Sequence, residues 1–371
     1  MILRLGNREQ LKFKISKIHA KSQHLFDRFI RRLPLKMVCL DLDGTALNDS
    51  KQIVPENLET LNEVRQNNKD LMVNIVTGRG FHQAKRYANE MKAKYFATDN
   101  GGAIFERKGE EYELIESSKM KEEDCLLVSN KILGYSKENQ DMIYHLSTPD
   151  KFIIGEGEEN FKKAHDIFYP GEVFGDGVVQ VGSLEEIQEQ GLGKDIIKMC
   201  VDFRAGAIGK QQFHDFENFL KEKNIDYFKT SDSKIEIAPK GGSKCSAIEK
   251  IREIEEERGN SIGKRQVLTI GDSDNDIPMF KGGYQSFCPS NAKEKFKKTL
   301  PANVQILKSD NNGPLIDDAL SRFGGAIEPV KRSFNPSNVA KTVRDLVTRR
   351  PRCTLGDLNK RNSGRNDGHD R

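Results

Sequence analysis

Residues 38–45, Val-Cys-Leu-Asp-Leu-Asp-Gly-Thr, constrain the fold more than any other stretch of this chain. An apolar run stops at two aspartates one residue apart, as expected for a buried strand with a polar site at its carboxyl end. Alternate residues of a strand project on the same side, so Asp41 and Asp43 should emerge together. Such carboxylates can share a cation, or act as a nucleophile and an acid–base catalyst. An ordinary strand followed by an aspartate–glycine turn explains these residues equally well.

Two further apolar runs end in the same way. Residues 71–76 lead into Thr-Gly-Arg-Gly, and residues 267–270 lead into Gly-Asp-Ser-Asp-Asn-Asp. In a doubly wound parallel sheet such turns gather at the carboxyl ends of the strands, where ligands bind. A glycine turn at 241–242 brings Lys244 to the start of a helix. Carboxylates from two places, a threonine hydroxyl and a lysine suit a phosphate with bound Mg²⁺.

Taken in order, these motifs resemble a known family. Asp-x-Asp-Gly-Thr, Thr-Gly-Arg, Gly-x-Ser-Lys and Gly-Asp-x-x-Asn-Asp are similar to the haloacid dehalogenase superfamily, most of all its Cof-type sugar-phosphatase branch. Asp-Asn-Gly-Gly at 99–102, Met279 and Ser-Asn-Ala at 290–292 also match that branch. The resemblance covers about residues 37–323 and implies an α/β fold, with a Rossmann-like doubly wound parallel-sheet core and an inserted α/β cap domain.

The resemblance also implies roles for individual residues. Asp41 would attack phosphorus to give an aspartyl-phosphate, and Asp43 would protonate the leaving alcohol and then activate water. Thr77 and Lys244 would hold phosphoryl oxygens. The further implied residues are Asp41, the Asp43 backbone carbonyl and Asp272 as Mg²⁺ ligands; Leu42, Gly78, Asn100 and Asn275 as phosphate contacts; and Asp276 as a support for Lys244 or a metal-bound water.

Several of these residues have simpler explanations. Thr77 is also a suitable cap for the helix that follows it. Lys240 and Lys234 compete with Lys244 for the phosphate, although the small-residue turn before Lys244 favours Lys244. Arg79 suits a salt bridge within the core as well as a contact with substrate.

The motifs divide the chain into segments. We expect a basic extension at 1–36, a catalytic core formed by 37–100 and 241–325, an inserted cap at 101–240, and a basic, disordered tail at 326–371. The expected core helices are 55–67, 81–92, 246–258 and 313–323, and the expected short core strands are 95–97, 285–288 and 303–307. The expected cap strands are 111–115, 142–146, 196–201 and 234–238, and the expected cap helices are 121–133, 161–168 and 210–223.

A cap that closes over the site would supply most substrate contacts. His145, His165, Arg204 and Lys198 are its polar or charged candidates, and for each a surface or packing role is preferred. Asp99, at the entrance to the cap, is interpreted as a turn residue.

Charge is distributed unevenly along the chain. The net charge of +4 combines +8 in residues 1–36, +6 in residues 328–371 and −10 between them. The first segment has apolar residues partly at helical spacing, which suits an anionic membrane surface, an acidic partner or a targeting peptide. Packing against the acidic body is slightly preferred. No basic motif interleaved with aromatics favours nucleic acid.

Composition narrows the function further. No apolar run approaches the roughly 20 residues that span a membrane, and six scattered cysteines without a Cys-x-x-Cys spacing indicate reduced thiols and a cytoplasmic protein. Organellar targeting by the first segment stays open. The family resemblance implies a Mg²⁺-dependent phosphatase for small phosphorylated metabolites. The alternatives are a phosphosugar mutase, and a phosphatase-like protein whose basic ends bind a membrane, nucleic acid or a partner.

Overall fold

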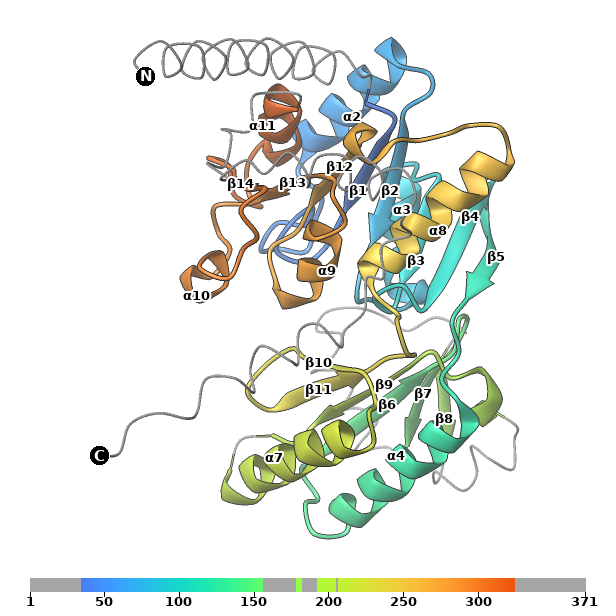
Figure 1. Cartoon of the computed structure of the whole chain (residues 1–371), viewed down its shortest axis with the longest axis vertical. Coiled ribbons are helices and arrows are strands. Elements are labelled where there is room, and N and C mark those ends of the chain that lie inside the picture. The colour runs from blue at the N-terminus through green and yellow to red at the C-terminus, as the bar shows by residue number, and fades with distance from the viewer. Residues whose placement is uncertain (1–34, 156–177, 182–191, 205, 324–371) are drawn as a thin grey trace, which may run out of the picture.

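The computed structural model describes residues 35–155, 178–181, 192–204 and 206–323 (Figure 1). The expected N-terminal extension, except its last two residues, and the expected tail lie outside this described part. So do the expected helix 161–168 and His165.

An eight-stranded sheet forms the core. Its strand order is β14-β13-β12-β1-β2-β3-β4-β5, and the six strands from β14 to β3 run parallel. The parallel strands are β1 (Met37–Leu40), β2 (Met72–Val76), β3 (Tyr95–Thr98), β12 (Val267–Ile270), β13 (Gln285–Cys288) and β14 (Val304–Ile306). The two segments expected to form the core, far apart in sequence, therefore meet where β1 pairs with β12.

Strands β4 (Ala103–Lys108) and β5 (Glu111–Ser117) extend the core sheet on the far side of β3. They form an antiparallel hairpin, and β4 also pairs antiparallel with β3. The strand expected at 111–115 is present as β5, but it joins the core sheet, so its assignment to a cap that begins at residue 101 is wrong. A hairpin that follows the last parallel strand closely pairs with it most readily, because antiparallel neighbours need only a short turn.

Helices cover both faces of the core sheet, and the alternation along β1 shows how. Val38 and Leu40 pack towards one helical layer, whereas Met37 and Cys39 pack towards the other. The first layer contains α2 (Pro55–Asn67), α3 (Phe81–Glu90) and α11 (Leu315–Arg322); the second contains α8 (Lys244–Glu257), α9 (Ile277–Phe280) and α10 (Glu294–Lys297). Because both faces are covered, a ligand site is expected at the carboxyl edge of the sheet.

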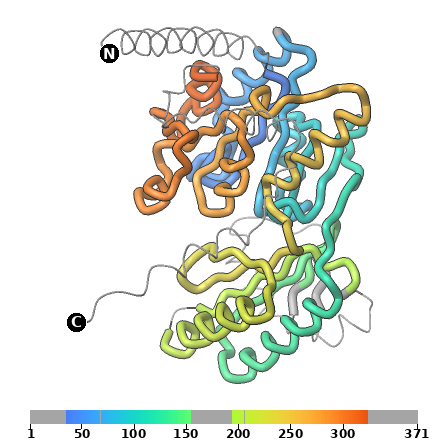
Figure 2. Tube along the Cα trace, viewed as in Figure 1, coloured from blue at the N-terminus to red at the C-terminus, as the bar shows by residue number. Residues whose placement is uncertain are grey.

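A second sheet of six strands forms the cap. Its strand order is β10-β11-β9-β6-β7-β8. The strands are β6 (Ile143–Ser147), β7 (Phe152–Gly155), β8 (Val178–Val181), β9 (Lys198–Asp202), β10 (Tyr227–Lys229) and β11 (Lys234–Ile237). Helices α4 (Glu122–Ser136) and α7 (Ala207–Glu222) cover the face that points away from the core, as Figure 1 shows. Figure 2 shows the chain passing into the cap after β5 and returning to the core before α8.

The two faces of the cap sheet differ in chemistry. Leu146, Met199 and Ile237 alternate onto the helix-covered face and join its apolar cluster. Their neighbours Lys198 and Glu236 therefore project towards the core. The face that carries Lys198 and Glu236 thus lies over the carboxyl edge of the core sheet.

The predicted α/β class, with a doubly wound core and an α/β cap, is confirmed. Helix α2 and strand β13 have the predicted bounds, and the other predicted helices of the described part differ by a few residues at one or both ends. Helix α8 begins at Lys244, two residues before the expected start, because the Ser243 hydroxyl caps it by accepting a hydrogen bond from the Ser246 amide.

Candidate active site

Lys244 lies at the centre of the carboxyl edge of the core sheet. Its Nζ is 2.6 Å from Oδ1 of Asp41, after β1, and 2.7 Å from Oδ1 of Asp276, after β12. All three side chains are buried. Burial by itself would lower the pKa of Lys244, but the Asp276 and Asp41 carboxylates outweigh it and raise that pKa above the ordinary lysine value. The lysine therefore remains a cation.

Three carboxylates crowd around this cation. One ligand atom from each of Asp41, Asp272 and Asp276 lies within 4.8 Å of the other two. Burial raises the pKa of Asp41 well above its ordinary value; Lys244 only partly offsets this, since Asp276 and Asp272 are close. Burial, followed by the charge of Asp276, raises the pKa of Asp272 to about 7. The cluster holds more negative charge than one lysine neutralises, which favours a further cation.

The hydrogen bonds identify which carboxylates are left for a metal. Asp276 is fully engaged: Oδ1 accepts from Lys244, and Oδ2 accepts from the amides of Asp272 (2.9 Å) and Ser273 (3.0 Å). Asp41 and Asp272 each keep a carboxylate oxygen to which the described part of the chain shows no hydrogen bond. These oxygens fit a hard cation such as Mg²⁺.

Two glycines make room for these carboxylates. Gly44 has a φ of 71°, and a Cβ there would lie 2.4 Å from Oδ2 of Asp272. A Cβ on Gly271 would lie 2.3 Å from Cγ of Asp276. The Thr45 hydroxyl donates to Oδ1 of Asp272 at 3.2 Å. A larger residue at either position would clash with a carboxylate, which explains why glycine stands beside the aspartates in both motifs.

Asp43 lies in a different environment from Asp41. Its carboxylate accepts two hydrogen bonds from Arg79, at 2.7 and 2.9 Å, and one from Lys51 at 2.7 Å. Although burial opposes ionisation, Arg79 and Lys51 lower the pKa of Asp43 well below its ordinary value. Arg79 thus forms the salt bridge that the sequence left open. In this conformation Asp43 is an ionised carboxylate rather than a proton donor.

Several of the expected phosphate-binding residues lie together at the same edge of the sheet. Thr77 is buried, and its Oγ1 accepts a hydrogen bond from the Arg79 amide at 3.2 Å. Helix α3 begins at Phe81 with Gly80 as its N-cap, so Thr77 does not cap it. Asn275 donates through Nδ2 to Oδ1 of Asn100 at 2.9 Å. Gly78 lies beside them, since a Cβ there would be 3.2 Å from Oδ1 of Asn100.

Other candidates lie further from the lysine. The Leu42 side chain is buried in the core, so only its backbone can serve a phosphate. Lys240 is exposed and Lys234 lies in β11, which leaves Lys244 as the lysine at the centre of the acidic cluster. Of the cap candidates, His145 is buried against the Phe152 ring, and Arg204 lies 3.9 Å from Asp202.

Sequence reasoning missed a contact between cap and core. Lys198, for which a surface or packing role was preferred, is buried with its Nζ 2.8 Å from Oδ1 of Asp99. Glu236 accepts from Nδ2 of Asn100 at 2.9 Å. Asp99 was interpreted as a turn residue only. Lys198 within the apolar run 196–201 was the available signal, because a lysine that is not exposed needs a charged partner.

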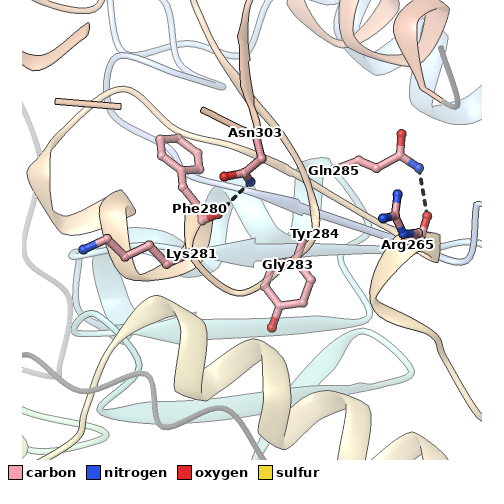
Figure 3. A pocket seen from close by; sticks show the side chains of 7 residues that line it. All are labelled: Arg265, Phe280, Lys281, Gly283, Tyr284, Gln285 and Asn303. Atoms are coloured by element: carbon pink, nitrogen blue, oxygen red, sulfur yellow. Dashed lines mark hydrogen bonds between the residues drawn. The ribbon is translucent and has the colours of Figure 1, made fainter. Parts of the chain in front are cut away.

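A small pocket of about 180 Å³ lies elsewhere, near the amino ends of β12 and β13 (Figure 3). Arg265, Lys281 and Tyr284 are among its lining residues. Within its wall, Asn303 donates to the Phe280 carbonyl at 3.0 Å. The acidic cluster follows the carboxyl ends of its strands, so this pocket belongs to the opposite edge of the sheet.

A doubly wound sheet with a buried lysine between carboxylates at its edge, under an inserted α/β domain, defines a capped hydrolase of the phosphatase type. None of the described helices is both long enough and apolar enough to cross a membrane. The family model for haloacid dehalogenase-like hydrolases matches residues 38–315. The chain belongs to this family, and the resemblance to its Cof-type branch is confirmed.

Relatives and solved structures agree. A 5-amino-6-(5-phospho-D-ribitylamino)uracil phosphatase of Bacillus subtilis is 25% identical over 307 residues, which are 77% of this chain and 99% of the relative. A haloacid dehalogenase-like hydrolase structure from B. subtilis has a TM-score of 0.59 at 17% identity, over 78% of this chain and 98% of that one. One from Bacteroides thetaiotaomicron has a TM-score of 0.56 at 20% identity, over 80% and 99%. The two structures support the fold.

Proposed function

We propose that this protein hydrolyses small phosphomonoesters through an aspartyl-phosphate on Asp41, with Mg²⁺ as its cofactor. The observation that carries the proposal is the meeting of Asp41, Lys244, Asp272 and Asp276 from three separate stretches of the chain. Phosphoryl transfer depends chiefly on positioning and on neutralising charge. This cluster provides both.

Asp41 acts as the nucleophile because it is buried at the end of a rigid strand, and Lys244 holds its carboxylate at 2.6 Å. The lysine also offsets the repulsion between this carboxylate and an incoming phosphate dianion. Asp276 fixes Lys244 and is fixed in turn by two backbone amides. The ammonium therefore has little freedom to reorient during the reaction.

Asp41 and Asp272 would hold Mg²⁺, together with the Asp43 backbone carbonyl that the family resemblance implies. When bound, the ion supplies positive charge against the carboxylates and phosphoryl oxygens. Thr77, the Leu42 and Gly78 backbones, Asn100 and Asn275 would surround the phosphoryl group. The Thr77 hydroxyl already accepts from the Arg79 amide, and within the described residues no acceptor is seen for its proton, which would donate to a phosphoryl oxygen.

Asp43 would serve as acid and base for the leaving alcohol and the attacking water. This role requires that its carboxylate exchange Arg79 and Lys51 for the substrate oxygen, because the salt bridges now keep it ionised. Substrate binding under the cap would drive this exchange, as closure of a lid often completes an active site.

The substrate would be a small phosphorylated metabolite, such as a sugar phosphate. Two relatives from B. subtilis are named as phosphatases for 5-amino-6-(5-phospho-D-ribitylamino)uracil, so phosphorylated polyols and that compound belong in the test. The experiment is a screen of purified protein against phosphorylated metabolites, with and without Mg²⁺. Released phosphate that depends on Mg²⁺ supports the proposal; isomerised sugar phosphate without released phosphate supports a mutase. If none of the tested compounds is hydrolysed, the proposed phosphatase function is overturned.

We also propose a cytoplasmic location and an anionic contact for the two basic ends. The support for the location is the six scattered cysteines, and the support for the contact is the charge of the ends, +8 over residues 1–36 and +6 over residues 328–371, against −10 for the rest. Removing both segments should leave hydrolysis unchanged and abolish any binding to anionic vesicles. Binding to nucleic acid would instead weaken steeply with salt.

A further inference from the structure

Strand β9 of the cap places Lys198, a second buried lysine, against the core. Its Nζ donates to the Gly78 carbonyl at 2.8 Å and lies 2.8 Å from Oδ1 of Asp99. The exposed fractions of the Lys198 and Asp99 side chains are 4% and 0%. Gly78 follows β2, and Asp99 follows β3. One cap side chain therefore binds two loops of the core at the edge that carries the acidic cluster.

This lysine is charged although it is buried. Burial would lower the pKa of Lys198, but the carboxylates of Asp99 and Glu236 outweigh it and raise that pKa above the ordinary value. Asp99 and Asn100 both have left-handed backbone conformations, with φ of 52° and 57°. Such conformations are uncommon outside glycine, and where they persist they often mark functional positions. The turn thus presents its carboxylate to the lysine in a fixed direction.

The same turn is tied to the Thr77 loop by backbone hydrogen bonds. The Asp99 amide donates to the Arg79 carbonyl and the Asn100 amide donates to the Thr77 carbonyl, each at 2.9 Å. A second cap residue, Glu236, accepts from Asn100, which in turn accepts from Asn275. The cap therefore places a cation on one residue of the turn and an anion on the next.

One peptide group connects Lys198 to Thr77. The Gly78 carbonyl that accepts from Lys198 and the Arg79 amide that donates to Thr77 Oγ1 at 3.2 Å belong to the same planar unit. Lys198 therefore fixes the orientation of the amide that fills one lone pair of the Thr77 hydroxyl. With that lone pair occupied, the hydroxyl proton points away from the amide.

We propose that Lys198 is a positioning residue for phosphoryl transfer, acting through the Gly78–Arg79 peptide to align the Thr77 hydroxyl with the phosphate. This inference rests on the proposed phosphatase function. The proposal also makes the closed cap part of the phosphate site, because the Lys198 ammonium belongs to the cap and moves with it. A cap that lifts away would release the peptide and loosen the Thr77 hydroxyl.

The test uses the full chain and a double variant, Lys198→Met with Asp99→Asn, which removes both charges and leaves no unpaired ion buried. We expect kcat to fall about 10- to 100-fold, since small displacements of a positioning group have effects of this size. KM should change less than about threefold, and the melting temperature should stay near that of the wild type. Lys210→Met, at an exposed lysine on α7, is the matched control and should behave as wild type.

A purely structural role would lower kcat independently of Thr77. We therefore combine the Lys198→Met/Asp99→Asn pair with Thr77→Val: the positioning role predicts that kcat of the combined variant equals that of Thr77→Val alone, whereas independent effects multiply. Three results would each overturn the positioning role: losses of kcat that multiply in the combined variant, a wild-type kcat in Lys198→Met/Asp99→Asn, or failure of Lys198→Met/Asp99→Asn to fold. A wild-type protein that hydrolyses no phosphomonoester overturns the proposed function, and the positioning role with it.

Discussion

Two buried lysines mark two regions where this molecule joins distant parts of its chain. Lys244, at the start of core helix α8, lies between Asp41 and Asp276. Lys198, on cap strand β9, lies against Asp99 and the Gly78 carbonyl. Each ammonium keeps its charge because carboxylates outweigh the effect of burial.

The difference lies in what each cation binds besides its carboxylates. Lys244 is surrounded by acidic side chains of the site, so its charge acts directly where phosphate would bind. Lys198 donates one hydrogen bond to the Gly78 backbone carbonyl, so it acts by orienting the Gly78–Arg79 peptide. The same requirement, that a buried ammonium be paired, thus serves neutralisation in one region and alignment in the other.

The largest expected effect belongs to the Lys244 region. Asp41→Asn should lower kcat by about 10⁴-fold or more, because an amide cannot form the aspartyl-phosphate. The variant should stay folded, since Lys244 keeps Asp276 as its partner. Steady-state kinetics with thermal unfolding checks this. An Asp41→Asn protein with near wild-type kcat would remove Asp41 as nucleophile, and with it the distinction between the two lysines.

Lys244→Met should come next, with loss of both activity and stability. We expect about 10³-fold lower kcat, because the phosphate then meets uncompensated carboxylates. Removing one partner of a buried ion pair also costs about 3–5 kcal/mol in the free energy of unfolding. Lys240→Met, four residues earlier at an exposed position, is the control and should change that free energy by less than about 0.5 kcal/mol. Urea unfolding and kinetics measure both effects; an equal loss of kcat in Lys244→Met and in the Lys198→Met/Asp99→Asn variant would contradict the contrast.

Removal of Mg²⁺ tests whether the ion binds in the Lys244 region and not in the Lys198 region. Chelation should lower activity by about 10²- to 10³-fold, since a bound catalytic metal ion lowers the activation barrier by several kcal/mol. Added Mg²⁺ should raise the melting temperature of the wild type, because it relieves repulsion among the acidic residues. Asp272→Asn should lose this rise, and the Lys198→Met/Asp99→Asn variant should keep it. A rise that survives in Asp272→Asn would place the ion elsewhere.

Mg²⁺ affinity should depend on pH through Asp272, whose pKa of about 7 results from burial and from Asp276. The ion requires the carboxylate, so affinity should fall about tenfold for each pH unit below 7. Without Mg²⁺, the folding stability should change with pH in the opposite direction to the Mg²⁺ affinity. The folded pKa exceeds the unfolded value of about 3.9, so this stabilising contribution is full below that value and is lost as pH rises through 7. Melting temperatures across pH 5–8, with and without Mg²⁺, measure both trends, and both should be weaker in Asp272→Asn, where, of the cluster, only Asp41 keeps a raised pKa.

The sequence predicted the core far better than the contacts of the cap. Asp41, Lys244 and Asp272 follow apolar runs or a glycine turn, and parallel strands bring such ends together at one edge. The strand at 111–115 was assigned to the cap, and β4 was not predicted, because these strands resemble those of any mixed α/β segment. Which sheet a strand joins depends on tertiary pairing, and local pattern does not determine it.

The Lys198 contact could not have been predicted from local pattern. Its partners Gly78 and Asp99 lie 120 and 99 residues away, in loops of another domain. Sequence shows that a lysine stands beside apolar residues, but it does not show which carboxylate compensates its burial. The ionisation of Asp43 was missed for the same reason, because Arg79 and Lys51 reach it from different loops.

Lys51→Met should have the smallest effect and separates exposed from buried cations. The Lys51 and Asp43 side chains are 44% and 42% exposed, so water screens their pair, and its loss should cost at most about 1 kcal/mol of stability near pH 7. That contribution exists above the unfolded pKa of Asp43 and fades as pH falls through the lower folded value. The pKa of Asp43 should rise in the variant, which leaves it closer to a usable acid, so kcat should change less than about threefold, upward at acidic pH. A loss as large as that in Lys244→Met would mean that exposure does not separate these lysines, and that Lys51 itself binds the phosphate.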